Sequence, residues 1–570
     1  SAHRLLADSY LNLADYDARV SEQRTADLLS PLTFNMFNSL GETNSLGDYN
    51  ALFDKKETRK SADMTWASRQ DGWVGSLMAT GKGEDYGYLM SYLPEYKYGS
   101  HQGTFYSHNQ MRGAVQYQIT PDDRLVFDST YRVRNQDGSS DSDLSTDFHF
   151  GRVRMGYNHR VSPSTLFLSQ AEYVRDSIGT QQGGSQGILV LDTTTNEYNF
   201  GSFDGRTTAS ERFSWVNLTN QALYTSHFVD SVFGVEGSSI DSSERSKSVV
   251  DSTEGFPPPT GNEFSSGASP TLNSGSVYEY LSLKVPRRAA LTLGVKAVRL
   301  ENPFNQFSPY VDDKIVLSGV EPKFGLVLTP NSWLTGRAAY FEELRKSTLS
   351  DFSSLEPTTI GGINQRFLDT SGTESSNVGV GLDAKAPNTI YGGVQYVRRN
   401  ISQTFGNATD VATTDGVSTQ VVPLNYGATS LYYRADIVKG YVYTELSKDS
   451  VFTVDTIFQY DRGTASDSFI NLSTQKHRLA YRRFFGKHIS TEGAGTFVKQ
   501  RYGDGVGEDP GGFWLYDVGA YYRFSEQHGR FFVRMDNILN HQYVYDPFQN
   551  LDPSLVYGRS VLVGVSYNFF

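Results

Sequence analysis

Residues 124–134 read RLVFDSTYRVR. In this stretch every second side chain is apolar or small, and the side chains between them are mostly charged or polar. The first row holds Leu125, Phe127, Ser129, Tyr131 and Val133, and the second holds Arg124, Asp128, Thr130, Arg132 and Arg134. Because successive side chains of a strand point to opposite faces, this alternation predicts a β-strand with one apolar face and one wet face.

The same two-residue period continues from about residue 57 to the C-terminus. It is clear in residues 151–160, 167–173, 514–524 and 561–569. We count about 22 such segments in the sequence, with the least distinct ones at residues 57–69, 71–81 and 424–446. An even number of antiparallel strands would place both ends of this region on the same side of a sheet.

The connections between these segments alternate in length. Short polar turns such as Pro121-Asp122-Asp123 and Ser447-Lys448-Asp449 take turns with long polar connections at 178–207, 241–274, 346–374 and 403–423. Short turns on one side and long loops on the other are typical of a transmembrane β-barrel. A soluble β-sandwich array or a propeller is the alternative, but no repeat of about 40–50 residues recurs, as a propeller would require. We therefore predict an all-β, antiparallel transmembrane barrel of about 22 strands.

The composition excludes several classes of function. The 570 residues include 36 Tyr, 35 Phe and 53 Gly, which favours many strands and turns over disorder. The absence of cysteine excludes disulfides, cysteine-ligated metals and cysteine catalysis. A net charge of −12 argues against a general nucleic-acid-binding surface. No apolar run reaches the roughly 18 residues of a transmembrane helix, and no catalytic motif is found, so we expect neither an enzyme nor a cofactor.

Residues 1–56 differ from the rest of the chain. Leucines at positions 5, 6, 11 and 13, followed by Val20, Leu28 and Leu29, predict two short amphipathic helices, the second ended by Pro31. The start has no basic and then apolar stretch, so no signal peptide is visible. We therefore predict two parts, a periplasmic helical or irregular segment at 1–56 and an outer-membrane barrel at 57–570.

The wet rows of the strands give candidate lumen-lining residues. These are Asp128, Arg132, Arg134, Arg152, Arg154, Arg160, Glu172, Asp436, Asp455, Arg478, Arg482, Asp517 and Arg523. A stripe of arginines on neighbouring strands could select anions, but we favour ion pairs that stiffen the wall. Aromatic residues near strand ends, such as Trp333, Tyr391 and Tyr522, would form girdles at the membrane interfaces. A barrel this wide must be filled, gated or occupied.

One acidic loop is a weak candidate for a calcium site. Asp137, Asp141 and Asp143 alternate with small residues, and several carboxylates together can bind Ca²⁺. Because such loops are more often simply solvated, we predict no metal.

The C-terminal residues resemble a known family. VRMDNILNHQY at 533–543 is similar to the penultimate strand of TonB-dependent outer-membrane receptors, and Tyr557-Gly558-Arg559-Ser560 with the strand to Phe570 resembles their last strand. The resemblance implies a bacterial outer-membrane barrel in membrane lipid. It also implies that the barrel-assembly machinery reads the terminal aromatics Tyr567, Phe569 and Phe570, where Phe570 extends the usual end by one residue.

The N-terminal residues suggest how the barrel works. The family's plug domain and TonB-contacting box are not found, whereas His3–Tyr10 with Ala18–Glu22 resembles the junction in proteins that join periplasmic tetratricopeptide repeats to an outer-membrane barrel. This resemblance implies a plugless, porin-like conduit for export, or the anchor of a secretion or surface assembly, working with a periplasmic partner. Two alternatives stay open. One is a TonB-dependent uptake receptor for siderophore, cobalamin or glycan whose plug is absent from this chain, and the other is a structural barrel closed by a partner protein.

Overall fold

The computed structural model describes the following residues of the chain: 58–68, 71–98, 105–137, 145–192, 197–254, 263–269, 271–285, 288–301, 315–346, 355–357, 359–365, 367, 369, 371–386, 390–414, 419–463, 472–502, 511–524, 529–541 and 558–569. The predicted helices and the predicted boundary between residues 56 and 57 lie outside these residues. No helix in the described ranges is long and apolar enough to span a membrane.

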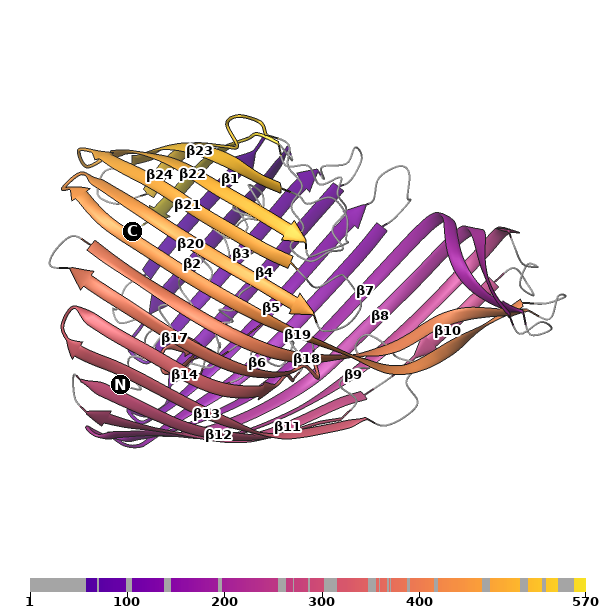
Figure 1. Ribbon diagram of the computed structural model, residues 1–570, viewed down its shortest axis with the longest axis horizontal. Coiled ribbons are helices and arrows are strands. Elements are labelled where there is room, and N and C mark those ends of the chain that lie inside the picture. Colours follow the sequence, from indigo (N-terminus) through magenta and orange to yellow (C-terminus); the bar gives the residue numbers. More distant parts are fainter. Residues whose placement is uncertain are drawn as a thin grey trace.

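The described residues form one closed, antiparallel barrel (Figure 1). Its first half consists of β1 (Thr58–Ala67), β2 (Gly72–Lys82), β3 (Tyr86–Tyr98), β4 (Phe105–Gln118), β5 (Asp123–Asp137), β6 (Ser145–Ser162), β7 (Thr165–Asp192), β8 (Glu197–Thr225), β9 (Val229–Glu254), β11 (Thr271–Val285) and β12 (Ala289–Glu301). Its second half consists of β13 (Val316–Asn331), β14 (Leu334–Leu344), β17 (Glu374–Ala386), β18 (Ile390–Thr414), β19 (Thr419–Ser447), β20 (Ser450–Gly463), β21 (Leu472–Phe485), β22 (Ile489–Tyr502), β23 (Gly511–Arg523), β24 (Gly529–Asp536) and β25 (Ser560–Phe569).

The ring closes where the first and last strands meet. β1 pairs with β25 in an antiparallel register from Lys60 with Phe569 to Ala67 with Leu562, so the backbone of neither strand is left at an edge. The predicted number of 22 strands is confirmed, and each of the predicted segments contains one strand of the barrel. Three shorter strands lie outside the ring: β10 (Glu263–Ala268), β15 (Thr359–Ile360) and β16 (Ile363–Asn364).

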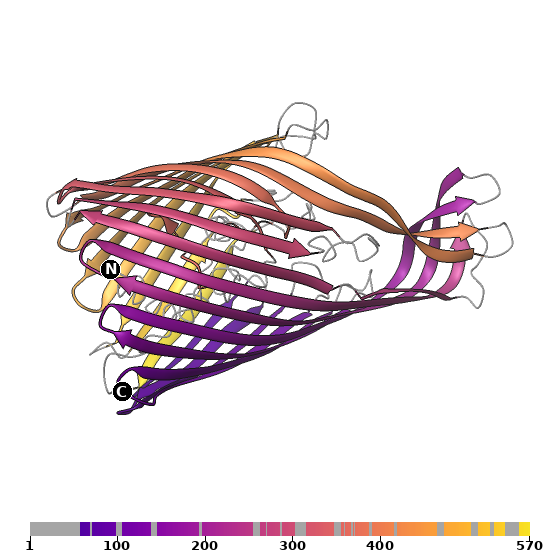
Figure 2. The same cartoon turned by 90° about the horizontal axis from the view of Figure 1, so that it is seen from below.

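Three of the four predicted long loops are wrong, because the strands continue through them. The connections expected at 178–207, 241–274 and 403–423 are largely extensions of β7, β8, β9, β18 and β19, which project far beyond the other strands (Figure 2). The two extended hairpins meet, since β18 and β7 pair in parallel at Val411–Thr414 and Leu189–Asp192. In these extensions apolar residues no longer alternate with polar ones, as in IGTQQGGSQGILVLD at 178–192, so the two-residue apolar period ends although the backbone pairing does not.

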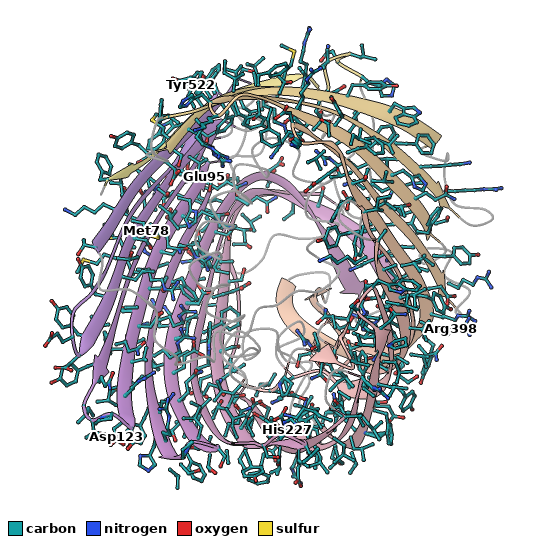
Figure 3. The ribbon with its side chains drawn as sticks, turned by 90° about the vertical axis from the view of Figure 1, so that its left-hand side faces the viewer. Met78, Glu95, Asp123, His227, Arg398 and Tyr522 are labelled. Atoms are coloured by element: carbon teal, nitrogen blue, oxygen red, sulfur yellow. The ribbon has the colours of Figure 1, made fainter. Side chains whose placement is uncertain are left out.

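The two faces of the barrel wall differ in character. Large apolar side chains such as Leu125, Phe127 and Tyr131 are exposed on the outside, while Asp128 and Thr130 between them are buried on the inside. Seen along the barrel from the side of the short turns, Tyr522 and Arg398 project outward and Glu95 inward (Figure 3). The alternation in the sequence therefore corresponds to an apolar outer surface and a polar lumen.

Candidate functional site

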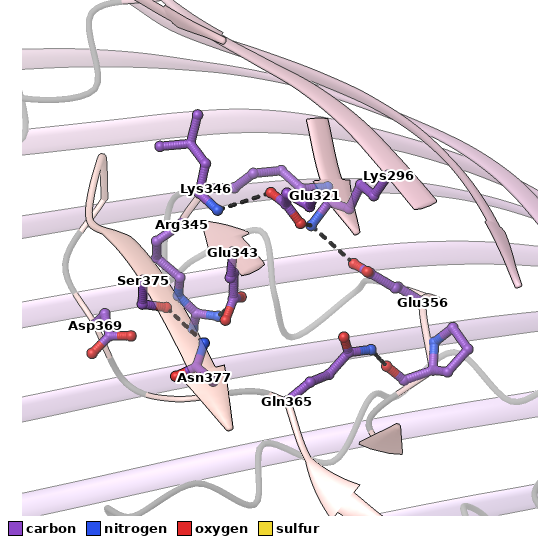
Figure 4. Close-up of polar contacts among 12 residues, drawn as sticks. Lys296, Glu321, Glu343, Arg345, Lys346, Glu356, Gln365, Asp369, Ser375 and Asn377 are labelled. Carbon is purple, nitrogen blue, oxygen red and sulfur yellow. Dashed lines mark hydrogen bonds and ion pairs between the residues drawn. The ribbon is translucent and has the colours of Figure 1, made fainter. Parts of the chain in front are cut away.

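The fourth predicted outer loop, at 346–374, is also placed differently from expectation. After β14 ends at Leu344, the chain turns into the barrel and returns to the wall at the start of β17. We call residues 345–373 the inner segment. Its described residues are 345–346, 355–357, 359–365, 367, 369 and 371–373. They form a cluster of polar contacts with the lumen wall (Figure 4).

The ends of the inner segment are fastened together. The backbone N–H of Arg345 donates to the carbonyl of Thr373 at 2.8 Å, and the N–H of Gly372 donates to the carbonyl of Arg345 at 2.9 Å. The Arg345 side chain is 2% exposed and lies 3.3 Å from Glu343. Next to it, the Lys346 ammonium forms an ion pair with Glu236 of β9 and donates to the Ser276 hydroxyl of β11 at 2.8 Å.

Glu356 binds the inner segment to three strands of the wall. Its carboxylate lies 3.1 Å from the Lys296 ammonium on β12 and 3.9 Å from the Lys323 ammonium on β13, and it accepts a hydrogen bond from the Tyr280 hydroxyl on β11. Glu321 pairs with both lysines, at 3.4 Å from Lys296 and 3.1 Å from Lys323. Two lysines thus share two carboxylates in a nearly dry site, and removal of one partner would leave a buried charge uncompensated.

Leucine 355 extends these contacts toward the first half of the barrel. It packs against Leu168 of β7 and Leu223 of β8, and its carbonyl accepts a hydrogen bond from Gln221 Nε2 at 2.7 Å. Because Glu356 reaches β11 to β13 at the same time, these two adjacent residues connect strands from β7 to β13 on the inner wall.

A tight hairpin forms the middle of the inner segment. β15 and β16 are joined by Gly361 and Gly362, which have φ values of 54° and 75°, in the left-handed region that glycine adopts readily. Ile360 and Ile363 on either side are fully buried in a cluster with Phe341, Tyr278 and other wall residues. The hairpin lies so close to β13 that a Cβ atom on Gly325 would be 2.4 Å from the Gly361 nitrogen.

The return path is held by Arg399 of β18. Its guanidinium donates to Asp369 at 2.5 Å and to the Asn377 side chain at 3.0 Å, and it stacks on the Phe367 ring at 3.7 Å from the ring centre. Phe367 in turn stacks on Phe341 with ring centres 6.4 Å apart. The inner segment is therefore fixed at both ends and in the middle.

Among the candidate lumen residues, Arg152 and Arg154 of β6 gather with Arg112 of β4 around one carboxylate of β5. Asp128 lies 2.7 Å from Arg112, 3.2 Å from Arg152 and 3.3 Å from Arg154. Glu172 lies 3.8 Å from Arg152. These contacts form a network of ion pairs within the wall. Such a network was one of the two interpretations of the arginine stripe that the sequence suggested.

The other lumen candidates lie apart from this network. Arg132 and Arg134 lie over the Phe148 ring, and Arg478 and Arg482 pair with Glu492. Asp455 accepts a hydrogen bond from Tyr443, and Asp517 accepts one from the Asn537 backbone. By register Arg160 and Arg523 belong to the inward row near the short turns. None of these candidates is among the described contacts of the inner segment.

The prediction that Asp436 lines the lumen is wrong. Its neighbours Ala435 and Ile437 are the buried residues of β19, and Asp436 is paired across the strands with Tyr460 and with Arg398, both on the outer surface. Asp436 therefore faces outward. The apolar residues of β19 here cover the inside of the wall, so the polarity of its two faces is the reverse of the usual one.

The remaining candidate sites are only partly described. Asp137 ends β5 and is exposed, whereas Asp141 and Asp143 lie outside the described residues. Within those residues no group of three His, Cys, Asp or Glu side chains could bind a metal. Tyr567 and Phe569 point outward on β25 with ring centres 4.8 Å apart, and Phe570 lies outside the described residues.

The sequence reasoning missed the charged residues that contact the inner segment. Lys296, Glu321 and Lys323 lie in the middle of strands that were correctly predicted, on the inward row. Charged residues at mid-strand positions of the inward row were a usable signal. Glu356 and Asp369 gave no such signal, because they lie in a polar connection.

Comparisons with known proteins identify the fold. No protein-family model matches the chain, and no curated protein matches it in sequence. Among solved structures, the copper transporter OprC superposes with a TM-score of 0.66 at 12% identity, over 91% of this chain and 81% of OprC. BauA, the ferric preacinetobactin receptor from Acinetobacter baumannii, superposes with a TM-score of 0.63 at 11% identity, over 90% of this chain and 80% of BauA. The FrpB iron transporter from Neisseria meningitidis superposes with a TM-score of 0.63 at 12% identity, over 91% of this chain and 82% of FrpB.

The fold is that of the TonB-dependent receptor barrel. The resemblance of the C-terminal strands to those receptors is thereby confirmed at the level of fold, and a barrel of this kind indicates the bacterial outer membrane. The resemblance of residues 1–56 to a tetratricopeptide junction is not tested and stays a prediction.

Proposed function

We propose that this chain forms the membrane-spanning barrel of an outer-membrane transport protein and that the inner segment controls passage through its lumen. The observation that carries the proposal is the docking of residues 345–373 on the inner wall through buried ion pairs. The polar inner wall suits a polar cargo, and the similar structures are named as transporters and receptors of copper, iron and a ferric siderophore. Chemistry on the cargo is not part of the proposal.

The direction of transport is a further part of the proposal. We favour an export conduit, or the anchor of a secretion or surface assembly, that works with a periplasmic partner of the tetratricopeptide type, and this preference rests on the sequence of residues 1–56. The second candidate is a TonB-dependent uptake receptor, which the fold of the similar metal and siderophore receptors favours. A barrel closed by a bound partner is the third, and a protein that co-purifies at fixed stoichiometry would favour it.

The test is single-channel conductance of the purified protein in a planar bilayer, with two glycine variants. Gly325→Ala puts a methyl group 2.4 Å from the Gly361 nitrogen and should displace the hairpin. Gly336→Ala, on the neighbouring strand β14, is the matched control, because a Cβ atom there meets nothing within 4 Å. We expect larger or more frequent conductance steps for Gly325→Ala, and wild-type behaviour for Gly336→Ala.

Two results would contradict control by the inner segment. The first is the same conductance for Gly325→Ala and wild type, both with and without residues 1–56. The second is a large conductance that appears only when residues 1–56 are deleted, whichever residue is at 325. The second result would assign the gate to the N-terminal segment instead. Uptake and export are then separated by measuring accumulation of labelled iron or copper in cells that carry the intact protein.

A further inference from the structure

The outward surface of β18, β19 and β20 changes sharply from apolar to cationic along each strand. Starting from the short turns, the outward residues of β18 are Ile390, Gly392, Val394, Tyr396 and Arg398. The outward row of β20 ends with Phe458, Tyr460 and Arg462. On β19 the row runs from Val442 and Val438 to Asp436 and Arg434. In each row the cation directly follows an aromatic or acidic residue, and the outward row continues beyond it with Asn400 on β18 and Tyr432 on β19. This order is independent of the lumen and of the proposed transport function.

The strand register places the cations of β18, β19 and β20 next to each other. Arg398 is opposite Asp436, and Arg434 is opposite Arg462. On β22, Lys499 and Arg501 belong to the outward row and end it in the same way. We call Arg398, Arg434, Arg462, Lys499 and Arg501 the outer basic cluster. Its residues lie on β18, β19, β20 and β22, and the β21 residues opposite Arg501 and Lys499 are Ser473 and Gln475. In Figure 3 the labelled Arg398 points away from the barrel.

The position of the cluster along the strands sets its depth in the membrane. Arg398 is eight residues beyond the start of β18 at Ile390, Arg462 is twelve beyond Ser450, and Arg434 is thirteen before Ser447. With a rise of about 3.3 Å per residue and a tilt of about 40°, these positions lie about 20–33 Å above the short turns. The apolar band of an outer-membrane barrel is about 25 Å tall, so the cluster lies at its outer boundary.

The contacts within the cluster hold its guanidinium groups in place. Asp436 accepts hydrogen bonds from Arg398 Nε at 3.0 Å and from the Tyr396 hydroxyl at 2.5 Å, and it pairs with Arg434 at 2.7 Å. Arg462 lies over the Tyr460 ring at 4.3 Å from its centre. One carboxylate serves two arginines, so the three arginines of β18–β20 keep an excess of positive charge, and the side chains of Arg398 and Arg434 are still 44% and 37% exposed.

We propose that the outer basic cluster binds the phosphorylated headgroup of a lipid in the outer leaflet of the membrane. A lipid-facing surface at this depth is reached by headgroups and is not accessible to soluble proteins. Arginine side chains present two N–H donors that match phosphate oxygens. Basic clusters at a membrane boundary are attracted to anionic lipids, with each cation strengthening binding about fivefold.

Lipid retention measured by native mass spectrometry tests the proposal. The purified full chain is titrated with a bisphosphorylated lipid A and, separately, with the same lipid after its phosphates are removed. The variant Arg434→Gln/Arg462→Gln should weaken binding of the phosphorylated lipid about 30-fold. The matched control Arg483→Gln/Lys487→Gln removes the same charge at the exposed short-turn end of β21 and should leave binding unchanged. Arg434→Lys/Arg462→Lys should retain part of the binding.

Three results would overturn the proposal. One is equal retention of both lipids by the wild-type protein, and another is equal retention of the phosphorylated lipid by wild type and the glutamine variant. A third is complete competition by millimolar inorganic phosphate, which would show that the site takes the free anion and not the headgroup. Heat-modifiable mobility on electrophoresis shows for each variant that the barrel is folded, so a loss of binding cannot be mistaken for misfolding.

Discussion

Replacement of Glu356 by glutamine should release the inner segment from the wall. In the docked state its carboxylate is 8% exposed and lies between the ammonium groups of Lys296 and Lys323. Loss of one partner from a buried ion pair costs about 3–5 kcal/mol. We take the lower end, because glutamine keeps a hydrogen-bonding carbonyl for Tyr280 and because Glu321 still pairs with both lysines. About 3 kcal/mol corresponds to a change of about 150-fold in the docking equilibrium.

The absence of cysteine from the chain makes this change measurable. Ser371 in the inner segment is 3% exposed, and Ser371→Cys introduces a single thiol of similar size. A maleimide reagent reaches that thiol only when the segment leaves the wall, so the labelling rate reports the undocked fraction. We expect Glu356→Gln to raise the rate about 100-fold over that of Ser371→Cys alone.

A second variant controls for the loss of a carboxylate elsewhere. Glu301 at the outer end of β12 forms an ion pair with Arg299 at 3.1 Å. The Arg299 side chain is 64% exposed. Exposed pairs contribute about 0–1 kcal/mol, so Glu301→Gln should change the labelling rate less than about fivefold. If Glu356→Gln leaves the rate within a factor of two of its parent, the ion pairs at Glu356 do not hold the segment and our reasoning fails.

Three other outcomes are expected. Gly361→Ala places a Cβ atom 2.5 Å from the Ala338 carbonyl at a positive φ, so it should also raise labelling of Ser371→Cys; an unchanged rate would show that the hairpin is not needed for docking. Asp128→Asn leaves three arginines around a neutral side chain, which should cost about 3–5 kcal/mol and lower the temperature of the heat-induced mobility shift by several degrees. Phe569→Ala should reduce the amount of folded protein in the outer membrane, and Val565→Ala on the same outward row should not; equal amounts would remove Phe569 from the assembly signal.

The sequence was sufficient to predict the barrel, because its strands cross an apolar layer. In that layer each outward residue must be apolar and each backbone group must be paired, so the period of two is visible and the strands can be counted. Outside the layer the constraint disappears. Residues such as Thr207 and Ser248 face each other across paired strands, yet nothing in their polarity distinguishes this extension from a loop.

Asp436 and the inner segment were not predictable for related reasons. Polarity was used to assign β19 residues to its faces, but the inward side there carries Ala435 and Ile437 and the outward side carries Arg434 and Asp436 at the membrane boundary. The inner segment depends on contacts between residues far apart in sequence, such as Lys346 with Glu236. A polar connection of this length has the same composition whether it lies outside a barrel or inside it.

The parallel pairing of β7 and β18 divides the outer mouth of the barrel. On one side of this bridge seven strands lie between β7 and β18, namely β8, β9, β11, β12, β13, β14 and β17. The longer way round the ring includes β1 and β25. The rim therefore encloses two windows of unequal circumference instead of one round opening. A folded cargo wider than the larger window must separate the four paired residues of each strand, whereas an extended chain can thread either window with the bridge intact.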